Sequence, residues 1–403
     1  MNAHDNRIIP QQPLPNRHAA VSSIRIVLVS LALLAVGCAP ALTQEAVTRQ
    51  ALTVDFGDFK SKAELTFPAS SSGALPTVIL IHGSGPEDMD ATIFGAGADG
   101  KPVKLSSIFK DIGDALPASG FAVLRYNKHY VTGAGEFDPQ AFFTKLDLNQ
   151  MLKDAERVLE IAKANSRVDA KRIYVYGWSE GSNVAAALVA KHPEIAGLIV
   201  QGPVALSWRE TLLSQILEVG VPHLRSLATD GRVTNATLQR VLTAPGGQVA
   251  KGILNYIGDP VAFQASRVEI NPLLDTNKNG ALDIDTELTP QVFGGILDAG
   301  FAGFFSIYAP GRALPTLLEA AGTLKLPVLV LQGANDANVP VRGAVALGAA
   351  LKTAGNTDAT LKVYAGLGHT LGLASSLIDD DFRPIAATPI ADLAAWLRER
   401  TKR

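Results

Sequence analysis

The sequence contains one cysteine, Cys38, among its 403 residues. A disulfide within the chain is therefore excluded. Charged residues make up only 18% of the sequence and nearly cancel, with a formal net charge of −2. Because such a chain has no basic stripe, we do not expect a nucleic acid partner. The apolar share of 47% is enough for a large core, and the length fits one α/β domain with an insertion.

The N-terminal region has no apolar run of the ~20 residues that a membrane-spanning helix needs. Its apolar run, residues 26–36, is shorter and follows three arginines, the last of which is Arg25. Small residues come next, ending in Gly37. This order predicts a bacterial secretory signal over residues 1–37, and we expect the chain to be exported across the inner membrane.

Cys38 directly follows the predicted signal, in the tetrapeptide Ala35-Val-Gly-Cys38. This tetrapeptide resembles a lipoprotein box, which implies acylation of Cys38 and a lipid anchor on the cell envelope. The membrane would then be a partner of the chain. An ordinary secretory signal with an incidental cysteine is the alternative. Residues 38–50 are predicted to be a polar tether, with the fold beginning near Leu52.

Short apolar runs recur along the chain with spacers of helical length. An edge hairpin is expected over residues 52–68, and the later runs are residues 77–81, 121–126, 173–176, 196–200, 327–331 and 361–364. Continuous apolar runs are typical of parallel strands that are covered on both faces. Helical periodicity in residues 148–162 and 389–399 supplies such cover. The sequence therefore predicts an α/β fold with a doubly wound, mostly parallel sheet.

Residues 206–325 interrupt this rhythm, because they contain no clear parallel strand. So long an interval predicts an inserted, mainly helical cap between a first core segment, 51–205, and a second core segment, 326–403. Such a cap is expected over the carboxyl ends of the strands, where ligands bind in open α/β sheets.

The segment Gly177-Trp-Ser179-Glu-Gly181 matches the pattern G-x-S-x-G and lies between an apolar run and a helix-like run. In that context the pattern is typical of a sharp turn that presents a nucleophilic serine. Ser179 is therefore the predicted nucleophile. A glycine-rich strand end that packs closely against a helix is the alternative.

A serine hydroxyl needs a base to remove its proton and a carboxylate to orient that base. On this fold the acid and then the histidine follow the serine, each just after a strand. Asp336 follows the run at 327–331, and His369 follows the run at 361–364. Of the seven histidines, only His369 comes after this acid. We therefore predict the triad Ser179, Asp336 and His369.

The same chemistry needs two backbone N–H groups that stabilise an oxyanion. One is expected from Glu180, the residue after the nucleophile. The other is expected from Ser84 in the glycine-rich turn His82-Gly-Ser-Gly-Pro86, and an ordinary turn is the alternative there.

Together these residues resemble the α/β-hydrolases, and the loop at 82–86 with Gly-Trp-Ser-Glu-Gly is similar to dienelactone hydrolase-like and acyl-thioesterase-like esterases. The segment Arg125-Tyr-Asn-Lys128 resembles Arg-Tyr-Asp-Lys in such proteins, with Asn127 in place of the acid. The resemblance implies hydrolysis of esters, thioesters or amides with no cofactor required. Dienelactone hydrolases themselves have a cysteine nucleophile, whereas this chain has Ser179.

The predicted cap contains a segment that resembles the first nine positions of an EF-hand loop, with oxygen ligands at alternate positions and Gly280 at the turn. The twelfth position, Thr286, departs from that pattern. A structural calcium ion is one hypothesis and a solvated polar turn is the other. The candidate ligands are Asp275, Asn277, Asn279, Ala281, Asp283 and Glu287.

The sequence thus predicts an exported serine hydrolase that cleaves a small-molecule or lipid-like carboxylic ester. A peptidase, a thioesterase or an acyltransferase with the same triad is an alternative. A surface binding protein that keeps the fold without its chemistry is an alternative from another class.

Overall fold

The computed structural model describes residues 46–97 and 101–402. The predicted signal at 1–37 and Cys38 lie outside these residues. Within the described part, no helix combines the length and the apolar character that crossing a membrane requires.

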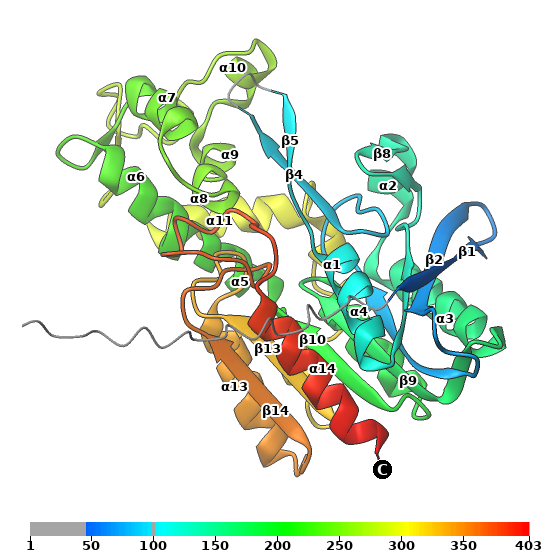
Figure 1. Cartoon of the computed structure of the whole chain (residues 1–403). Coiled ribbons are helices and arrows are strands. Elements are labelled where there is room, and N and C mark those ends of the chain that lie inside the picture. The colour runs from blue at the N-terminus through cyan, green and yellow to red at the C-terminus, as the bar shows by residue number, and fades with distance from the viewer. Residues whose placement is uncertain (1–45, 98–100, 403) are drawn as a thin grey trace, which may run out of the picture. The chain divides into compact units, whose positions relative to one another are not determined.

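An eight-stranded sheet forms the centre of the fold (Figure 1), in the order β1-β2-β6-β3-β9-β10-β13-β14. The pairs β1–β2 and β2–β6 are antiparallel, and the remaining neighbours are parallel. The predicted doubly wound, mostly parallel sheet is confirmed. The strands are β1 Val47–Asp55, β2 Lys60–Pro68, β3 Leu75–Ile81, β6 Ala122–Tyr126, β9 Val168–Trp178, β10 Gly197–Gln201, β13 Val328–Gly333 and β14 Ala359–Tyr364.

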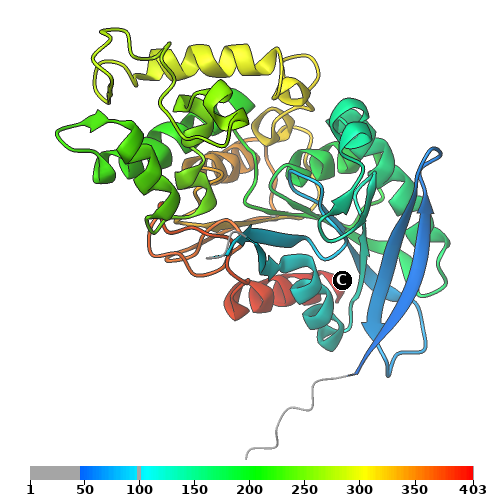
Figure 2. The ribbon, with the colours of Figure 1, turned by 90° about the horizontal axis from the view of Figure 1, so that it is seen from above.

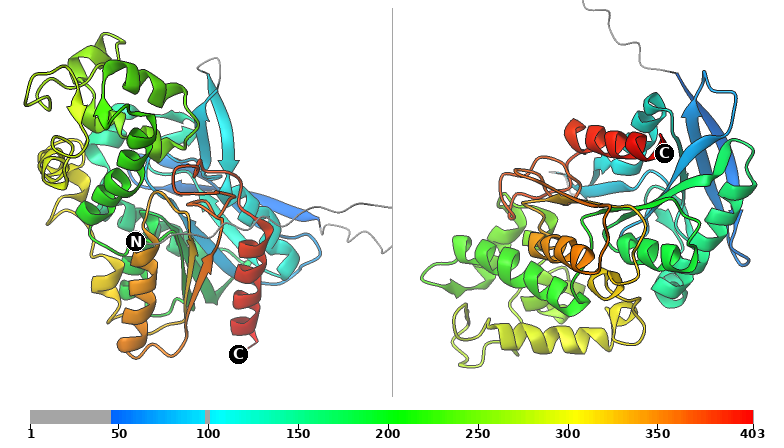
Figure 3. Two further views of the ribbon diagram at one scale, coloured as in Figure 1. Left: turned by 90° about the vertical axis from the view of Figure 1, so that its left-hand side faces the viewer. Right: turned by 90° about the horizontal axis from the view of Figure 1, so that it is seen from below.

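Helices cover both faces of the sheet, which is why β6, β10 and β13 are buried at every residue. One apolar cluster joins the sheet to α3, α4 and α13, and another joins it to α1 and α14. Figure 3 shows α13 in orange and α14 in red on opposite faces of the sheet. These core helices are α1 Ile108–Ala115, η1 Leu116–Ser119, α2 Pro139–Lys145, α3 Leu148–Ala164, α4 Gly181–Lys191, α13 Val341–Thr353 and α14 Ala387–Thr401.

The insertion between β10 and β13 is mainly helical, as predicted, and it has an apolar cluster of its own around Leu224, Leu238 and Phe293. Figure 2 shows these green to yellow elements gathered on one side of the sheet. They are α5 Trp208–Ser214, η2 Gln215–Gly220, α6 Val221–Leu227, β11 Arg232–Val233, α7 Asn235–Thr243, α8 Gln248–Lys251, α9 Leu254–Ile257, α10 Pro260–Gln264, β12 Leu282–Asp283, α11 Pro290–Phe301, η3 Ser306–Tyr308 and α12 Leu317–Ala320.

The structure differs from the sequence-based expectation at two places. The edge strand β1 begins at Val47, within the segment 38–50 that was expected to be a tether, because Val47 pairs with Pro68 of β2. Two small hairpins were not predicted, since their strands are short or largely exposed. They pair β4 Thr92–Ala96 with β5 Pro102–Ser107, and β7 Val131–Gly133 with β8 Glu136–Phe137.

Candidate active site

Ser179 lies at a sharp turn between β9, which ends at Trp178, and α4, which begins at Gly181. Its φ angle is +52°, a conformation that a non-glycine residue rarely adopts. The Ser179 N–H donates a 2.9 Å hydrogen bond to the carbonyl oxygen of Gln201 at the end of β10. The sheet therefore holds the serine in its strained conformation.

The glycines on either side of Ser179 are required by close backbone contacts. A Cβ atom on Gly177 would lie 2.4 Å from the carbonyl oxygen of Gly181, and one on Gly181 would lie 2.3 Å from the carbonyl oxygen of His82. Real Cβ atoms essentially never come so close to backbone. The glycines allow β9, α4 and the loop after β3 to meet at the serine.

Asp336 and His369 follow β13 and β14, and the structure brings them together. His369 Nδ1 lies 2.9 Å from Asp336 Oδ2, and each residue is 2% exposed. The other carboxylate oxygen, Asp336 Oδ1, accepts 2.9 Å hydrogen bonds from the N–H groups of Asn338 and Val339. The carboxylate is thus fixed on one side by backbone and faces the imidazole on the other.

Ser179 and His369 line the same cavity. Within the described residues, no hydrogen bond joins the Ser179 hydroxyl to the imidazole. Such contacts are often long in ligand-free enzymes and tighten when substrate binds.

Two opposing effects set the pKa of His369. Burial disfavours the imidazolium and lowers the pKa, whereas the charge and hydrogen bond of Asp336 and the charge of Asp380 raise it. The net result is a pKa above the ordinary value of 6.5. Asp336 therefore stabilises the cation that would form when His369 accepts a proton.

Asp380 is a second buried carboxylate at this site, and sequence analysis missed it. Its Oδ2 atom accepts 2.9 Å hydrogen bonds from the backbone N–H groups of His369 and Ala337. It thereby ties the loop that carries His369 to the loop that carries Asp336. Burial and the charge of Asp336 raise the pKa of Asp380 to about 6.

The two backbone N–H groups predicted for an oxyanion hole are those of Ser84 and Glu180. Neither N–H group has an acceptor among the described residues. The loop of Ser84 lies directly against the nucleophile, because a Cβ atom on Gly83 would be 3.3 Å from the Ser179 Cβ atom. Both groups are available to a ligand oxygen.

A buried ion pair lies beside these amides and was also missed. Lys128 Nζ lies 2.9 Å from Glu180 Oε1, and the two side chains are 5% and 2% exposed. Lys128 also donates a 2.6 Å hydrogen bond to the carbonyl oxygen of Gly83. The one sequence signal was the segment Arg125-Tyr-Asn-Lys128. It resembles a segment of related esterases, but that resemblance predicted no role for the lysine.

Glu87 adds another carboxylate to this wall of the cavity. Its Oε2 atom accepts a 3.0 Å hydrogen bond from the N–H of Gly83. Burial, only partly offset by the charge of Lys128, raises the pKa of Glu87 to about 8. At neutral pH the Glu87 carboxyl group is therefore largely protonated.

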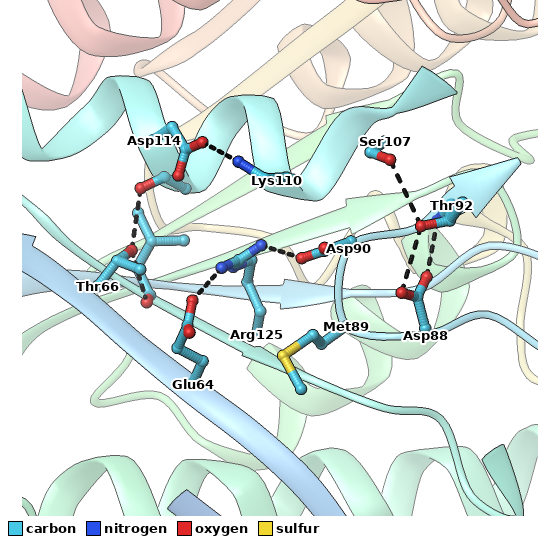
Figure 4. Close-up of polar contacts among 12 residues, drawn as sticks. Glu64, Thr66, Asp88, Met89, Asp90, Thr92, Ser107, Lys110, Asp114 and Arg125 are labelled. Atoms are coloured by element: carbon cyan, nitrogen blue, oxygen red, sulfur yellow. Dashed lines mark hydrogen bonds and ion pairs between the residues drawn. The ribbon is translucent and has the colours of Figure 1, made fainter. Parts of the chain in front are cut away.

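The rest of the segment Arg125-Tyr-Asn-Lys128, at the end of β6, holds the loop after β3. Figure 4 shows the buried Arg125 between Glu64 of β2 and Asp90, with an ion pair to each. Asn127 Oδ1 accepts a 2.8 Å hydrogen bond from the Met89 N–H. Asn127 stands where Arg-Tyr-Asp-Lys has an aspartate, and its side-chain oxygen still accepts a hydrogen bond from the loop after β3.

The cavity has a volume of about 790 Å³ and is lined by both the core and the cap. Trp178, which precedes the predicted nucleophile, is 3% exposed and lines this cavity, with its ring centroid 5.4 Å from that of His369. Most of the remaining lining of this cavity is apolar. It includes Phe142, Met151, Trp208, Leu212, Phe304 and Phe305.

In the calcium-like loop of the cap, the carboxylates accept hydrogen bonds from nearby backbone. Both oxygens of Asp275 accept from the N–H groups of Asn279 and Gly280, and Glu287 accepts from Thr276, Asn277 and Asp283. No group of three or more His, Cys, Asp or Glu side chains that could hold a metal ion occurs in the described part of the chain. Calcium binding by this loop stays a prediction.

Comparisons with known proteins bear on this site. The profile of the family Hydrolase_4, described as serine aminopeptidase S33, matches residues 103–252, which contain Ser179 but neither Asp336 nor His369. Esterase EstD from Thermotoga maritima is 33% identical over 170 residues, which are 42% of this chain. The chain spans only 35% of the length of that relative.

Solved structures match over most of the chain at low identity. Est1E from Butyrivibrio proteoclasticus is 16% identical, with 88% of this chain and 99% of that one covered and a TM-score of 0.44. The α/β-hydrolase GrgF from Penicillium sp. sh18 is 16% identical, with 89% and 100% covered and a TM-score of 0.47.

The sheet order and the strand–Ser179–helix turn decide the fold class. The chain has the α/β-hydrolase fold. The candidate serine, acid and histidine follow one another along the chain in the order that is usual for this fold. The cap lies in the connection between β10 and β13.

Proposed function

We propose that the chain is a serine hydrolase that cleaves carboxylic esters through an acyl-enzyme on Ser179. The observation that carries this proposal is that the strained Ser179 and His369 line the same cavity. The imidazole of His369 is held by the buried carboxylate of Asp336. A nucleophile, a base and an orienting acid in this order are the parts that acyl transfer needs.

In the proposed reaction, Ser179 Oγ attacks the acyl carbon while His369 Nε2 accepts the hydroxyl proton. The N–H groups of Ser84 and Glu180 donate hydrogen bonds to the resulting oxyanion. The C–O bond to the alcohol then breaks, and His369 gives its proton to that alcohol. A water molecule then gives a proton to His369 and attacks the acyl carbon. The bond to Ser179 Oγ breaks, the acid leaves, and His369 returns the proton to Ser179 Oγ. This sequence requires no cofactor.

The cavity supports a small-molecule or lipid-like ester as substrate. Its aromatic and aliphatic wall, including Phe142 and Leu212, would bury an apolar acyl or alcohol group. We therefore expect the reaction rate to depend on the length of the apolar chain.

The test is covalent labelling with a fluorophosphonate, together with hydrolysis of a series of p-nitrophenyl esters. We expect labelling at Ser179 and release of p-nitrophenol by the wild-type chain, and neither by Ser179→Ala. A well-folded wild-type chain that is neither labelled nor active would support a binding protein on this fold and overturn the proposal.

A peptidase with the same triad is the second candidate, because the matched family profile is described as a serine aminopeptidase. Aminoacyl p-nitroanilides distinguish the two, since an esterase of this design would hydrolyse them far more slowly than p-nitrophenyl esters. Hydrolysis of acyl-thioesters, and transfer of the acyl group to an added alcohol, would identify a thioesterase or an acyltransferase.

We also propose export with a lipid anchor on Cys38 and a structural calcium ion in the cap. Metabolic labelling with a fatty acid, lost in Cys38→Ser, tests the anchor. Calorimetric titration with calcium chloride tests the loop. Binding of calcium by the wild-type chain that is lost in Glu287→Gln would support the ion. The same heat of titration for both chains would contradict a calcium site at this loop.

A further inference from the structure

We propose that Lys128 is a positioning residue that orients the oxyanion hole through the carbonyl group of Gly83. This inference rests on the proposed function, because it concerns how that site stabilises the oxyanion. It starts from two contacts of one buried ammonium group: 2.6 Å to the oxygen of Gly83 and 2.9 Å to Glu180 Oε1.

The contact with Gly83 acts on the Ser84 N–H. The carbonyl of Gly83 and the N–H of Ser84 belong to one planar peptide unit and point in opposite directions. An ammonium group that holds the carbonyl on one side therefore turns the N–H to the other side. Within the described residues this N–H has no acceptor, so Lys128 leaves it directed at a ligand rather than at the protein.

The contact with Glu180 joins the second half of the oxyanion hole to the first. The two predicted donors belong to separate segments, the loop after β3 and the turn after β9. Lys128 bonds to both segments at once, and its own backbone N–H donates a 3.1 Å hydrogen bond to the carbonyl oxygen of Glu87 in the first. One buried side chain thus links the two segments that carry these N–H groups.

Burial makes this arrangement strong. A hydrogen bond from an ammonium group to a carbonyl oxygen is charge-assisted, and it polarises the peptide so that its N–H becomes a better donor. Because Lys128 is 5% exposed, solvent competes little with the Gly83 oxygen for its ammonium group. Loss of the lysine would leave the Ser84 peptide free to rotate.

Substitution of Lys128 alone would leave Glu180 as an unpaired buried charge, and the chain could fail to fold for that reason. The informative comparison is therefore the double variant Lys128→Met/Glu180→Gln against Glu180→Gln. Both lack the carboxylate, and they differ only at residue 128. In Glu180→Gln the Lys128 ammonium group keeps its hydrogen bond to the Gly83 oxygen, and the thermal midpoint of each variant checks that it is folded. Lys153→Met, at an exposed position of α3, is the control for loss of a lysine.

We expect kcat of the double variant on p-nitrophenyl butyrate to be about 10- to 100-fold below that of Glu180→Gln, somewhat less than the loss of a whole oxyanion donor. KM should stay within about threefold, since the interaction acts in the transition state. Affinity for phenylboronic acid, which forms a tetrahedral adduct on the serine, should fall with kcat. If Lys128 only stabilised the fold, its loss would lower the thermal midpoint of unfolding. It would not lower kcat while leaving KM nearly unchanged.

Equal kcat and equal boronate affinity in the double variant and Glu180→Gln would overturn this inference alone, because both chains would still hydrolyse the ester. A folded wild-type chain without esterase activity or fluorophosphonate labelling would instead overturn the proposed function, and the inference with it.

Discussion

The Tyr308 hydroxyl of the cap donates a 2.5 Å hydrogen bond to the carboxylate of Glu180, the residue after the predicted nucleophile. The same hydroxyl lies 3.2 Å from Ser84 Oγ, and the Tyr308 ring stacks on Trp208 with centroids 3.8 Å apart. A side chain of the insertion therefore completes the buried polar group beside the oxyanion hole. The cap contributes to the site itself and does not only cover it.

Tyr308→Phe should destabilise the fold while keeping the aromatic stack. The change removes a donor from a buried carboxylate and should lower the free energy of unfolding by roughly 1.5–3 kcal/mol. Denaturation by urea measures this loss. Tyr256→Phe is the matched control, because no hydrogen bond of the Tyr256 hydroxyl occurs in the described structure. Equal losses for the two variants would show that the contact with Glu180 contributes nothing.

Asp336→Asn should lower kcat/KM by about 10³–10⁴-fold, as for the equivalent change in serine proteases. The amide oxygen would stay on the N–H groups of Asn338 and Val339, which places the NH₂ group against His369 Nδ1. The imidazole would then carry its proton on Nε2 and could not accept one from Ser179. Ester hydrolysis measures the effect, and Asp298→Asn, a surface change, is the control. Retention of more than a tenth of the activity would remove Asp336 from the triad.

The pH profile should report the raised pKa of His369. Its neutral form is the base, so kcat/KM should rise with pH through a midpoint above 6.5. Asp380→Asn removes a negative charge that raises this pKa, and its amide oxygen can still accept the N–H groups of His369 and Ala337. The midpoint should therefore move to lower pH. A midpoint that stays in place or moves to higher pH would mean that the charge of Asp380 does not raise the pKa of His369.

The order along the chain explains why the candidate triad could be predicted. Asp336 and His369 each follow an apolar run that can be recognised without a structure, so their positions at the edge of a parallel sheet follow from the fold. The ion pair of Lys128 and Glu180 joins residues 52 positions apart, and nothing in a local pattern says that both charges are buried. Tyr308 lies in an irregular part of the cap with no periodicity to place it.

Gly181→Ala should destabilise the chain even though alanine favours helices. Its Cβ atom would lie 2.3 Å from the carbonyl oxygen of His82 and 2.4 Å from that of Ile81. Because the backbone must move, we expect a loss of about 1–3 kcal/mol or more in the free energy of unfolding, with loss of activity as the loop of Ser84 shifts.

Gly295→Ala, in the interior of α11, is the control, because its added Cβ atom meets no atom within 4 Å. There the same substitution should stabilise the fold by about 0.5–1 kcal/mol. Urea denaturation of both variants tests this, and effects of the same sign would show that close packing at the turn does not require Gly181.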